Sequence, residues 1–165
     1  MKVNIALLTV TDTRTFDNDK SGAILVDKIF QAKHKLIDRK ICKDNKEDIV
    51  KILKEWTNQK DIDVIITTGG TGLTGRDNTV HSIKSIAEIE IPGFGELFRQ
   101  LSYQKIGTST IQSLASAFLV NKTYVFCLPG SVSAVKDAWN DILFFQLDIR
   151  HKPCNFIELI PRLDE

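Results

Sequence analysis

Four glycines fall within seven residues of one loop, and this loop constrains the chain more than any other segment. Gly69–Gly75 follows an apolar run, Ile62–Ile66, that is typical of a buried strand. It precedes Thr79, a predicted cap for a helix that begins near Val80. Glycines allow a sharp turn and bring bare N–H groups close to a ligand. Such a turn between a strand and a helix predicts a phosphate-binding loop.

The loop ends in a carboxylate, Asp77. An acid beside a bound phosphate is repulsive unless a divalent cation lies between them, so this combination predicts a metal–phosphate site. Without Asp77 and the additional glycines, a loop that only connects a strand to a helix would fit about as well, because short glycine motifs often match by chance.

Residues Gly70–Gly75 also satisfy the pattern G-x-G-x-x-G. A dinucleotide-binding fold requires this motif after the first strand, with an acid about twenty residues later at the end of the next strand. Here the motif follows the third predicted strand, and Glu90 lies after a helix, beside a proline. A Walker loop fits less well still, because no Gly-Lys-Ser/Thr follows. Both interpretations are therefore disfavoured.

The composition is that of an ordinary soluble globular protein. The chain has 165 residues, of which 42% are hydrophobic and 26% charged, and it is most simply one domain spanning residues 1–165. The formal net charge of +1 favours neither nucleic acid nor an anionic membrane as a partner. We see neither a signal peptide nor a membrane span, so we expect a cytoplasmic protein.

The cysteines and histidines do not have the spacing of metal ligands. We expect the cysteines to be reduced core thiols, the histidines to be surface residues, and the tryptophans to pack in the core from apolar helix faces. These residues are Cys42, Cys127 and Cys154, His34, His81 and His151, and Trp56 and Trp139.

Apolar runs and helical periodicity alternate along the chain. Strands are predicted at Val3–Val10, Leu36–Cys42, Ile62–Thr67, Tyr124–Leu128 and, in a shorter form, Asn155–Leu159. Helices are predicted from Ser21, after Asn45, at Val80–Ala87, at Glu96–Tyr103, at Gln112–Leu119 and after Ser131. Strands separated by helices, several of them apolar on both faces, predict an α/β fold with a largely parallel sheet covered on two sides.

In such folds ligands bind beyond the carboxyl ends of the strands, where the strand order reverses. Four loops should share that edge: Thr11–Arg14, Lys43–Asp44, Gly69–Asp77 and Pro129–Ser131. Thr11, Asp12 and Arg14 offer hydroxyls and a phosphate fork, Asp44 a second carboxylate, and Ser131 a cap at an anion-friendly helix start. Each of these also fits an ordinary polar loop, turn or cap residue.

Three motifs, in this order, resemble those of the MoaB/Mog family of molybdenum cofactor biosynthesis proteins, the molybdopterin adenylyltransferases. They are Thr68–Gly72 with Arg76–Thr79, Pro92–Glu96, and Leu128–Ser131. Two further segments, Ile106–Thr110 and Pro153–Phe156, are similar to the MoaB branch of this family. The resemblance covers essentially the whole chain.

The resemblance implies a three-layer α/β domain that assembles as a homotrimer or, in the MoaB branch, as a homohexamer of two trimers. It also implies Mg²⁺- and ATP-dependent adenylylation of the terminal phosphate of molybdopterin, with release of pyrophosphate. The implied partners are the pterin phosphate, the nucleotide and the molybdate-insertion protein of the same pathway.

The matching motifs also suggest roles for individual residues. The catalytic and Mg²⁺-binding residues would be Asp77 and Asp44. The pterin substrate would bind at Thr68, Gly69, Gly70, Thr71, Gly72, Ser109, Ser113, Pro129, Gly130 and Ser131, and the nucleotide at Thr11, Asp12 and Arg14.

The chain departs from the family pattern at three places. Val80 and His81 replace a Pro-Glu or Pro-Asp pair, Leu114 replaces an arginine that follows Ser113, and Phe118 lies where the family favours small residues or glycine. Loss of an arginine beside a phosphate removes a bidentate clamp that other side chains replace poorly. A MoaB-type protein that binds molybdopterin or a nucleotide without catalysis is therefore the alternative function.

Overall fold

The computed structural model describes residues 1–165 and contains one six-stranded sheet, in the spatial order β2-β1-β3-β6-β5-β4. The strands are β1 (Asn4–Val10), β2 (Lys35–Cys42), β3 (Val64–Thr68), β4 (Ile89–Glu90), β5 (Ser116–Val120) and β6 (Thr123–Leu128). Strands β2, β1, β3 and β6 are parallel, whereas β5 and β4 are antiparallel to their neighbours. The prediction of a mostly parallel sheet is confirmed.

Helices precede or follow most of the strands. They are α1 (Lys20–Gln31), α2 (Lys46–Thr57), α3 (Thr79–Lys84), α4 (Pro92–Ile106), α5 (Val132–Ala138), α6 (Phe144–Gln146) and α7 (Phe156–Leu159). Shorter turns are the 3₁₀ helices η1 (Gly107–Gln112) and η3 (Ile160–Arg162) and the π-helical η2 (Trp139–Leu143). None of the helices combines the length and apolar character needed to cross a bilayer.

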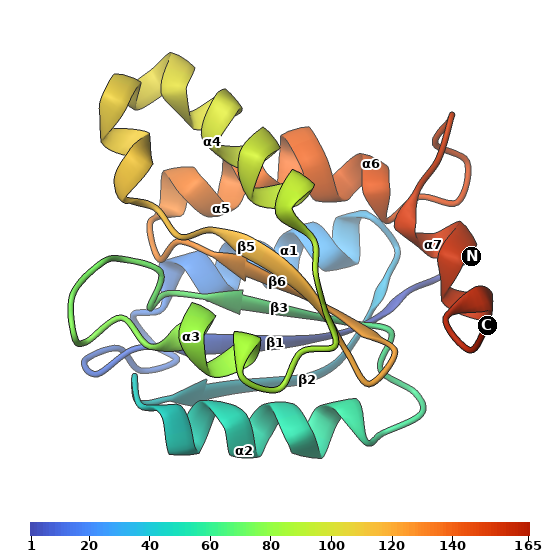
Figure 1. Ribbon diagram of the computed structural model, residues 1–165, viewed down its shortest axis with the longest axis horizontal. Coiled ribbons are helices and arrows are strands. Elements are labelled where there is room, and N and C mark those ends of the chain that lie inside the picture. Colours follow the sequence, from blue (N-terminus) through green and yellow to red (C-terminus); the bar gives the residue numbers. More distant parts are fainter.

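The helices form a layer on each face of the sheet, as Figure 1 shows, with α1, α4 and α5 on one side and α2 and α3 on the other. Side chains of a strand alternate between faces. Ile5 and Leu7 of β1 therefore join one core cluster, and Ala6 and Leu8 join the other. Both tryptophans are buried as predicted, one in each cluster. The structure has the three layers that the family resemblance implies.

The predicted helix at Gln112–Leu119 is wrong, because its second half belongs to strand β5. Its small residues suggested a helix, yet Ala117 packs in the core cluster on one face of the sheet and Phe118 in that on the other. This alternation is the signature of a strand buried on both faces. Asn121 and Lys122, both with positive φ, then turn the chain into β6.

The predicted strand at Asn155–Leu159 is also wrong, because it forms the short helix α7. The Asn155 side chain accepts a hydrogen bond from the N–H of Glu158 at 3.0 Å and so caps this helix. An asparagine three residues before a glutamate is the spacing of a capping box, which is the signal that could have identified α7.

The smaller differences from the prediction concern the bounds of two helices and the burial of one cysteine and one histidine. Helix α1 is capped by Asp19 rather than by Ser21, and α4 begins earlier and ends later than predicted. Cys154 is exposed rather than a core thiol. His34 is half-buried rather than a surface residue, and its burial lowers its pKa.

Candidate functional site

The loops that follow β1 and β3 leave the same edge of the sheet, as predicted, on the left in Figure 1. Strand β1 pairs with β2 on one side and with β3 on the other, so the strand order reverses between β1 and β3. Thr11 N–H donates to the carbonyl of Cys42 at 2.9 Å, and the N–H of Asp44 donates to Asp12 Oδ1 at 3.0 Å. The loops after β1 and β2 are therefore joined at this edge.

Glycine is required at the first two positions of the loop after β3. Gly69 has φ +96° and Gly70 φ +68°, a region that disfavours side chains. A Cβ on Gly69 would lie 2.2 Å from the carbonyl oxygen of Val10, and one on Gly70 would lie 2.2 Å from Thr79 Oγ1. The loop therefore packs directly against the end of β1 and the start of α3.

Thr79 does not cap α3 as predicted. Its hydroxyl donates to the carbonyl of Gly69 at 2.9 Å, and Asn78 occupies the cap position without a side-chain capping bond. The N–H of Thr79 also donates to the carbonyl of Gly70 at 3.1 Å. Because both bonds use loop carbonyls, Thr79 holds the glycine turn closed.

Asp44 lies against this turn. Its Oδ1 accepts a hydrogen bond from the N–H of Asn78 at 2.9 Å, and a Cβ on Gly70 would lie 2.8 Å from its Oδ2. Burial raises the pKa of the Asp44 carboxyl, and the charges of Asp77 and Asp12 raise it further, while the bonds from Asn78 oppose the shift. Asp77 and Asp12 are thus close enough to repel the carboxylate of Asp44.

Asp77 folds back over the same loop. Its Oδ2 accepts hydrogen bonds from the Thr74 hydroxyl at 2.6 Å and from the Thr74 N–H at 3.0 Å. The Thr74 hydroxyl bond, together with the backbone N–H groups of Gly72 and Thr74, lowers the pKa of Asp77 although partial burial opposes this. A Cβ on Gly72 would lie 2.7 Å from Asp77 Oδ2, so Asp77 packs on the loop beside Gly72 as Asp44 does beside Gly70.

No group of three His, Cys, Asp or Glu side chains is arranged to hold a metal ion. Mg²⁺ at nucleotide sites commonly takes one or two carboxylates and completes its shell with substrate phosphates and water. Asp44 and Asp77 are hard oxygen ligands, and their mutual repulsion is the kind that a cation relieves. Asp44 and Asp77 are therefore residues of the type that Mg²⁺ takes as ligands.

The loop after β6 completes this edge. Thr68 Oγ1 donates to the carbonyl of Pro129 at 2.9 Å. The carbonyl of Gly130 accepts from Arg14 Nη1 at 3.1 Å and from Ser21 Oγ at 2.7 Å. The structure thus brings together the predicted residues Thr68, Pro129, Gly130 and Arg14. One N–H donor of Arg14 is already hydrogen-bonded within the protein.

The three predicted serines lie in different settings. Ser131 caps α5 by accepting the N–H of Ala134 at 3.2 Å, as predicted. Ser113 Oγ accepts from the N–H of Ala115 at 3.3 Å, in a segment that is hydrogen-bonded to the glycine loop. Ser109 is exposed on η1 and makes no side-chain hydrogen bond, so no bond joins it to the loop.

Sequence reasoning missed residues that organise the site. Asp19 is buried, caps α1, and accepts hydrogen bonds from Thr9 Oγ1 at 2.6 Å and Arg39 Nη2 at 3.1 Å. An acid just before a helical pattern is a capping signal that could have identified it. The contact of Asn78 with Asp44 joins residues 34 positions apart, and no local pattern indicates it.

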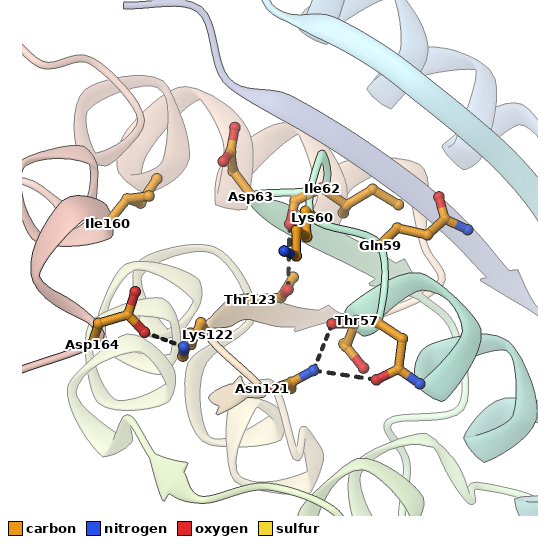
Figure 2. Close-up of a pocket in the computed structure, with 11 residues that line it drawn as sticks. Thr57, Gln59, Lys60, Ile62, Asp63, Asn121, Lys122, Thr123, Ile160 and Asp164 are labelled. Atoms are coloured by element: carbon orange, nitrogen blue, oxygen red, sulfur yellow. Dashed lines mark hydrogen bonds and ion pairs between the residues drawn. The ribbon is translucent and has the colours of Figure 1, made fainter.

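A hollow of about 470 Å³ lies at the opposite edge of the sheet, and Figure 2 shows the residues around it. It lies between the end of α2, the β5–β6 turn and the last residues of the chain. Asn121 Nδ2 donates to the carbonyl of Thr57 at 2.8 Å, and Lys122 pairs with Asp164. None of the predicted site residues lines it, and these bonds join three segments of the fold.

Comparisons with known proteins identify the family of this chain. A sequence family described as a probable molybdopterin binding domain matches residues 6–148. The chain is 43% identical over 152 residues to molybdenum cofactor biosynthesis protein B of Escherichia coli K12, which covers 92% of this chain and 89% of that protein.

Solved structures give the same result. The crystal structure of a molybdenum cofactor biosynthesis protein B superposes with a TM-score of 0.86 at 39% identity, covering 89% of this chain and 92% of that one. The tungsten cofactor synthesizing protein MoaB from Pyrococcus furiosus superposes with a TM-score of 0.77 at 34% identity, covering 86% of this chain and 91% of that one.

Proposed function

Because the chain belongs to the MoaB-type molybdenum cofactor biosynthesis proteins, we propose that it is a molybdopterin adenylyltransferase. One observation carries this proposal. Two carboxylates, Asp44 and Asp77, lie against two glycines of the loop that we expect to bind phosphate. A site that only bound an anion would gain nothing from two acids, whereas a site that joins phosphates through Mg²⁺ requires them.

The reaction needs positioning more than covalent chemistry. An oxygen of the terminal phosphate of molybdopterin attacks the α-phosphorus of ATP, and the bond from that phosphorus to the pyrophosphate oxygen breaks. Adenylylated molybdopterin and pyrophosphate are the products. Two polyanions must approach in line, so N–H donors and charge neutralisation supply most of the catalysis. In this proposal the N–H groups of Gly70 and Thr71 hold the pterin phosphate, because the N–H of Gly69 already donates to the carbonyl of Leu128 and that of Gly72 to Asp77.

Asp44 and Asp77 would hold Mg²⁺, which would neutralise negative charge on the phosphates when bound. Thr11, Asp12 and Arg14 contact the nucleotide, since the hydrogen bonds of Asp12 and Arg14 place their loop beside both Asp44 and Gly130. The pterin contacts Thr68, Gly69, Gly70, Thr71, Gly72, Ser109, Ser113, Pro129, Gly130 and Ser131.

We also propose a homotrimer or homohexamer in the cytoplasm. The end of α4 and the turn after it project from the body of the molecule (Figure 1). This segment exposes the apolar side chains of Tyr103, Ile106 and Ile111, and Leu97 is exposed earlier in the same helix. Apolar surface of this kind is favourable to bury between subunits. The molybdate-insertion protein of the same pathway is the partner that would receive the product.

A non-catalytic MoaB-type binder is the second candidate, and Leu114 favours it. The Leu114 side chain packs against the second core cluster beside the loop. The position that carries an arginine in related sequences therefore offers no cation to phosphate.

Turnover separates the two functions. Purified protein with molybdopterin, ATP and Mg²⁺ should form adenylylated molybdopterin and pyrophosphate, and Asp77→Ala should abolish both. If the wild-type protein binds molybdopterin tightly yet yields no adenylylated product, the transferase proposal is wrong and the binder stands. Leu114→Arg would then test whether the lost cation is the cause.

A further inference from the structure

Arg99 on α4 reaches the chain on both sides of Leu114. Its Nη1 donates to the carbonyl of Ala115 at 2.9 Å and lies 3.3 Å from that of Ser113. One guanidinium nitrogen thus binds the two carbonyls that flank a single residue. Charged donors make stronger hydrogen bonds than neutral ones, so this contact is a strong restraint on the backbone.

Gly95 allows this approach. A Cβ on Gly95 would lie 2.4 Å from the carbonyl oxygen of Ala115 and 2.7 Å from Arg99 Nη2. Helix α4 therefore packs directly on the start of β5 through a residue without a side chain. Thr110 adds a bond from its hydroxyl to the carbonyl of Arg99 at 3.4 Å. The backbone of Arg99 is therefore bonded to η1, while its guanidinium is bonded to the segment before β5.

The restrained segment touches the phosphate-binding loop. Between the two carbonyls that Arg99 binds, the N–H of Leu114 donates to the carbonyl of Thr71 at 2.9 Å. Thr71 is buried within the loop, between the glycines that contact Asp44 and Asp77. A chain of contacts therefore runs from Arg99 through Leu114 to the middle of the loop.

We infer that Arg99 is a positioning residue for the phosphate-binding loop, which acts through the Leu114–Thr71 hydrogen bond to keep the loop N–H groups set for a pterin phosphate. This inference rests on the proposed role of the loop in binding that phosphate. Arg99 itself need not touch substrate. Lysine can supply one charged donor but not a rigid fork, so it should replace Arg99 only in part.

The decisive experiment measures amide hydrogen exchange by NMR in the wild-type protein, Arg99→Ala and Arg99→Lys. Arg162→Ala, an exposed arginine that pairs with Glu165, is the matched control. We expect exchange of the Leu114 amide to accelerate at least tenfold in Arg99→Ala and less in Arg99→Lys, with Ile65 in β3 unchanged. Exchange in the control should match that of the wild type.

Binding of molybdopterin without ATP gives the second measurement. The Kd should rise about tenfold in Arg99→Ala, with partial rescue in Arg99→Lys, since loss of a charged hydrogen bond has effects of this order. Unchanged Leu114 exchange, or equal acceleration at Leu114 and Ile65, would overturn the inference. If Arg99→Ala does not fold, Arg99→Lys decides by the same criteria. Neither measurement requires turnover, so failure of the transferase proposal would be seen separately.

Discussion

Asn78 and Asp44 hold each other through two hydrogen bonds. The N–H of Asn78 donates to Asp44 Oδ1 at 2.9 Å, and Asn78 Nδ2 donates to the carbonyl of Asp44 at 3.0 Å. The pair joins the end of β2 to the start of α3, directly beside the glycine loop. It leaves Asp44 Oδ2 without a hydrogen bond and facing Gly70, which is the oxygen that a metal ion could use.

Asn78→Ala should weaken Mg²⁺ binding while leaving the fold intact. The variant keeps the N–H bond to Asp44 but loses the side-chain bond, worth about 1 kcal/mol, so the concentration of Mg²⁺ at half-maximal activity should rise several-fold. Titration of activity with Mg²⁺ at saturating ATP measures this. Gln59→Ala, an exposed residue at the other edge of the sheet, should not shift the titration. An unchanged Asn78→Ala titration would mean that Asp44 needs no such clamp.

Gly70→Ala should impair ligand binding far more than Gly75→Ala. At Gly70 a methyl group meets Thr79 Oγ1 and Asp44 Oδ2 in a backbone with φ +68°, whereas at Gly75 it meets nothing within 4 Å. The strain of the left-handed conformation alone is about 1–2 kcal/mol. We expect Gly70→Ala to lose most molybdopterin affinity and several degrees of melting temperature. Equal affinities for the two variants, measured by calorimetry, would assign the loop a connecting role.

The two carboxylates should respond oppositely to pH. Asp44 has a raised pKa in the folded protein, so it favours the fold only at low pH, and this contribution is lost as pH rises through its folded pKa. Asp77 has a lowered pKa, so its contribution is present at neutral pH and is lost as pH falls through its folded pKa. Asp44→Asn should therefore leave the melting temperature at pH 7 unchanged or higher, while Asp77→Asn should lower it.

Carboxyl NMR titration gives a direct check of the coupling. Asp77→Asn removes a negative charge that raises the pKa of Asp44, so the Asp44 titration should move to lower pH. Asp44→Asn and Asp77→Asn should both lose Mg²⁺-dependent adenylylation. If the pH at the midpoint of the Asp44 titration is the same in Asp77→Asn as in the wild type, the two carboxylates do not share a cation.

Sequence periodicity predicts the parallel half of this fold well and the antiparallel half poorly. The first and third strands have compact, branched apolar runs and the second alternates, and their loops carry polar residues that the topology must collect at one edge. β5 has only a short apolar run, Ala117–Val120, preceded by small residues. Its sequence is compatible with a helix, and only pairing with β6 and burial on both faces select the strand.

The residues of the site also fall into those that the sequence predicts and those that it does not. Residues that belong to one continuous motif, such as Gly69–Gly72 and Asp77, are visible in the sequence because their chemistry and their spacing agree. Contacts between distant segments are not, since Asn78 on Asp44 and Arg99 on Ala115 depend on how α3 and α4 pack. Asp44 lies between these cases, as an acid at a strand end whose burial appears only in the fold.

A charged residue on the α4–η1 surface should dissociate the assembly that we propose. Ile106 is 54% exposed and Ile111 74% exposed, beyond the part of α4 that packs on the sheet. Glu at either position would place a charge in a subunit contact, which is costly when no partner compensates it. Ile106→Glu and Ile111→Glu should reduce the mass measured by light scattering to that of one chain, with the fold retained. Phe30→Glu, an exposed aromatic on α1, is the control and should not change the mass. A wild-type protein that is monomeric at micromolar concentration would contradict the assembly itself.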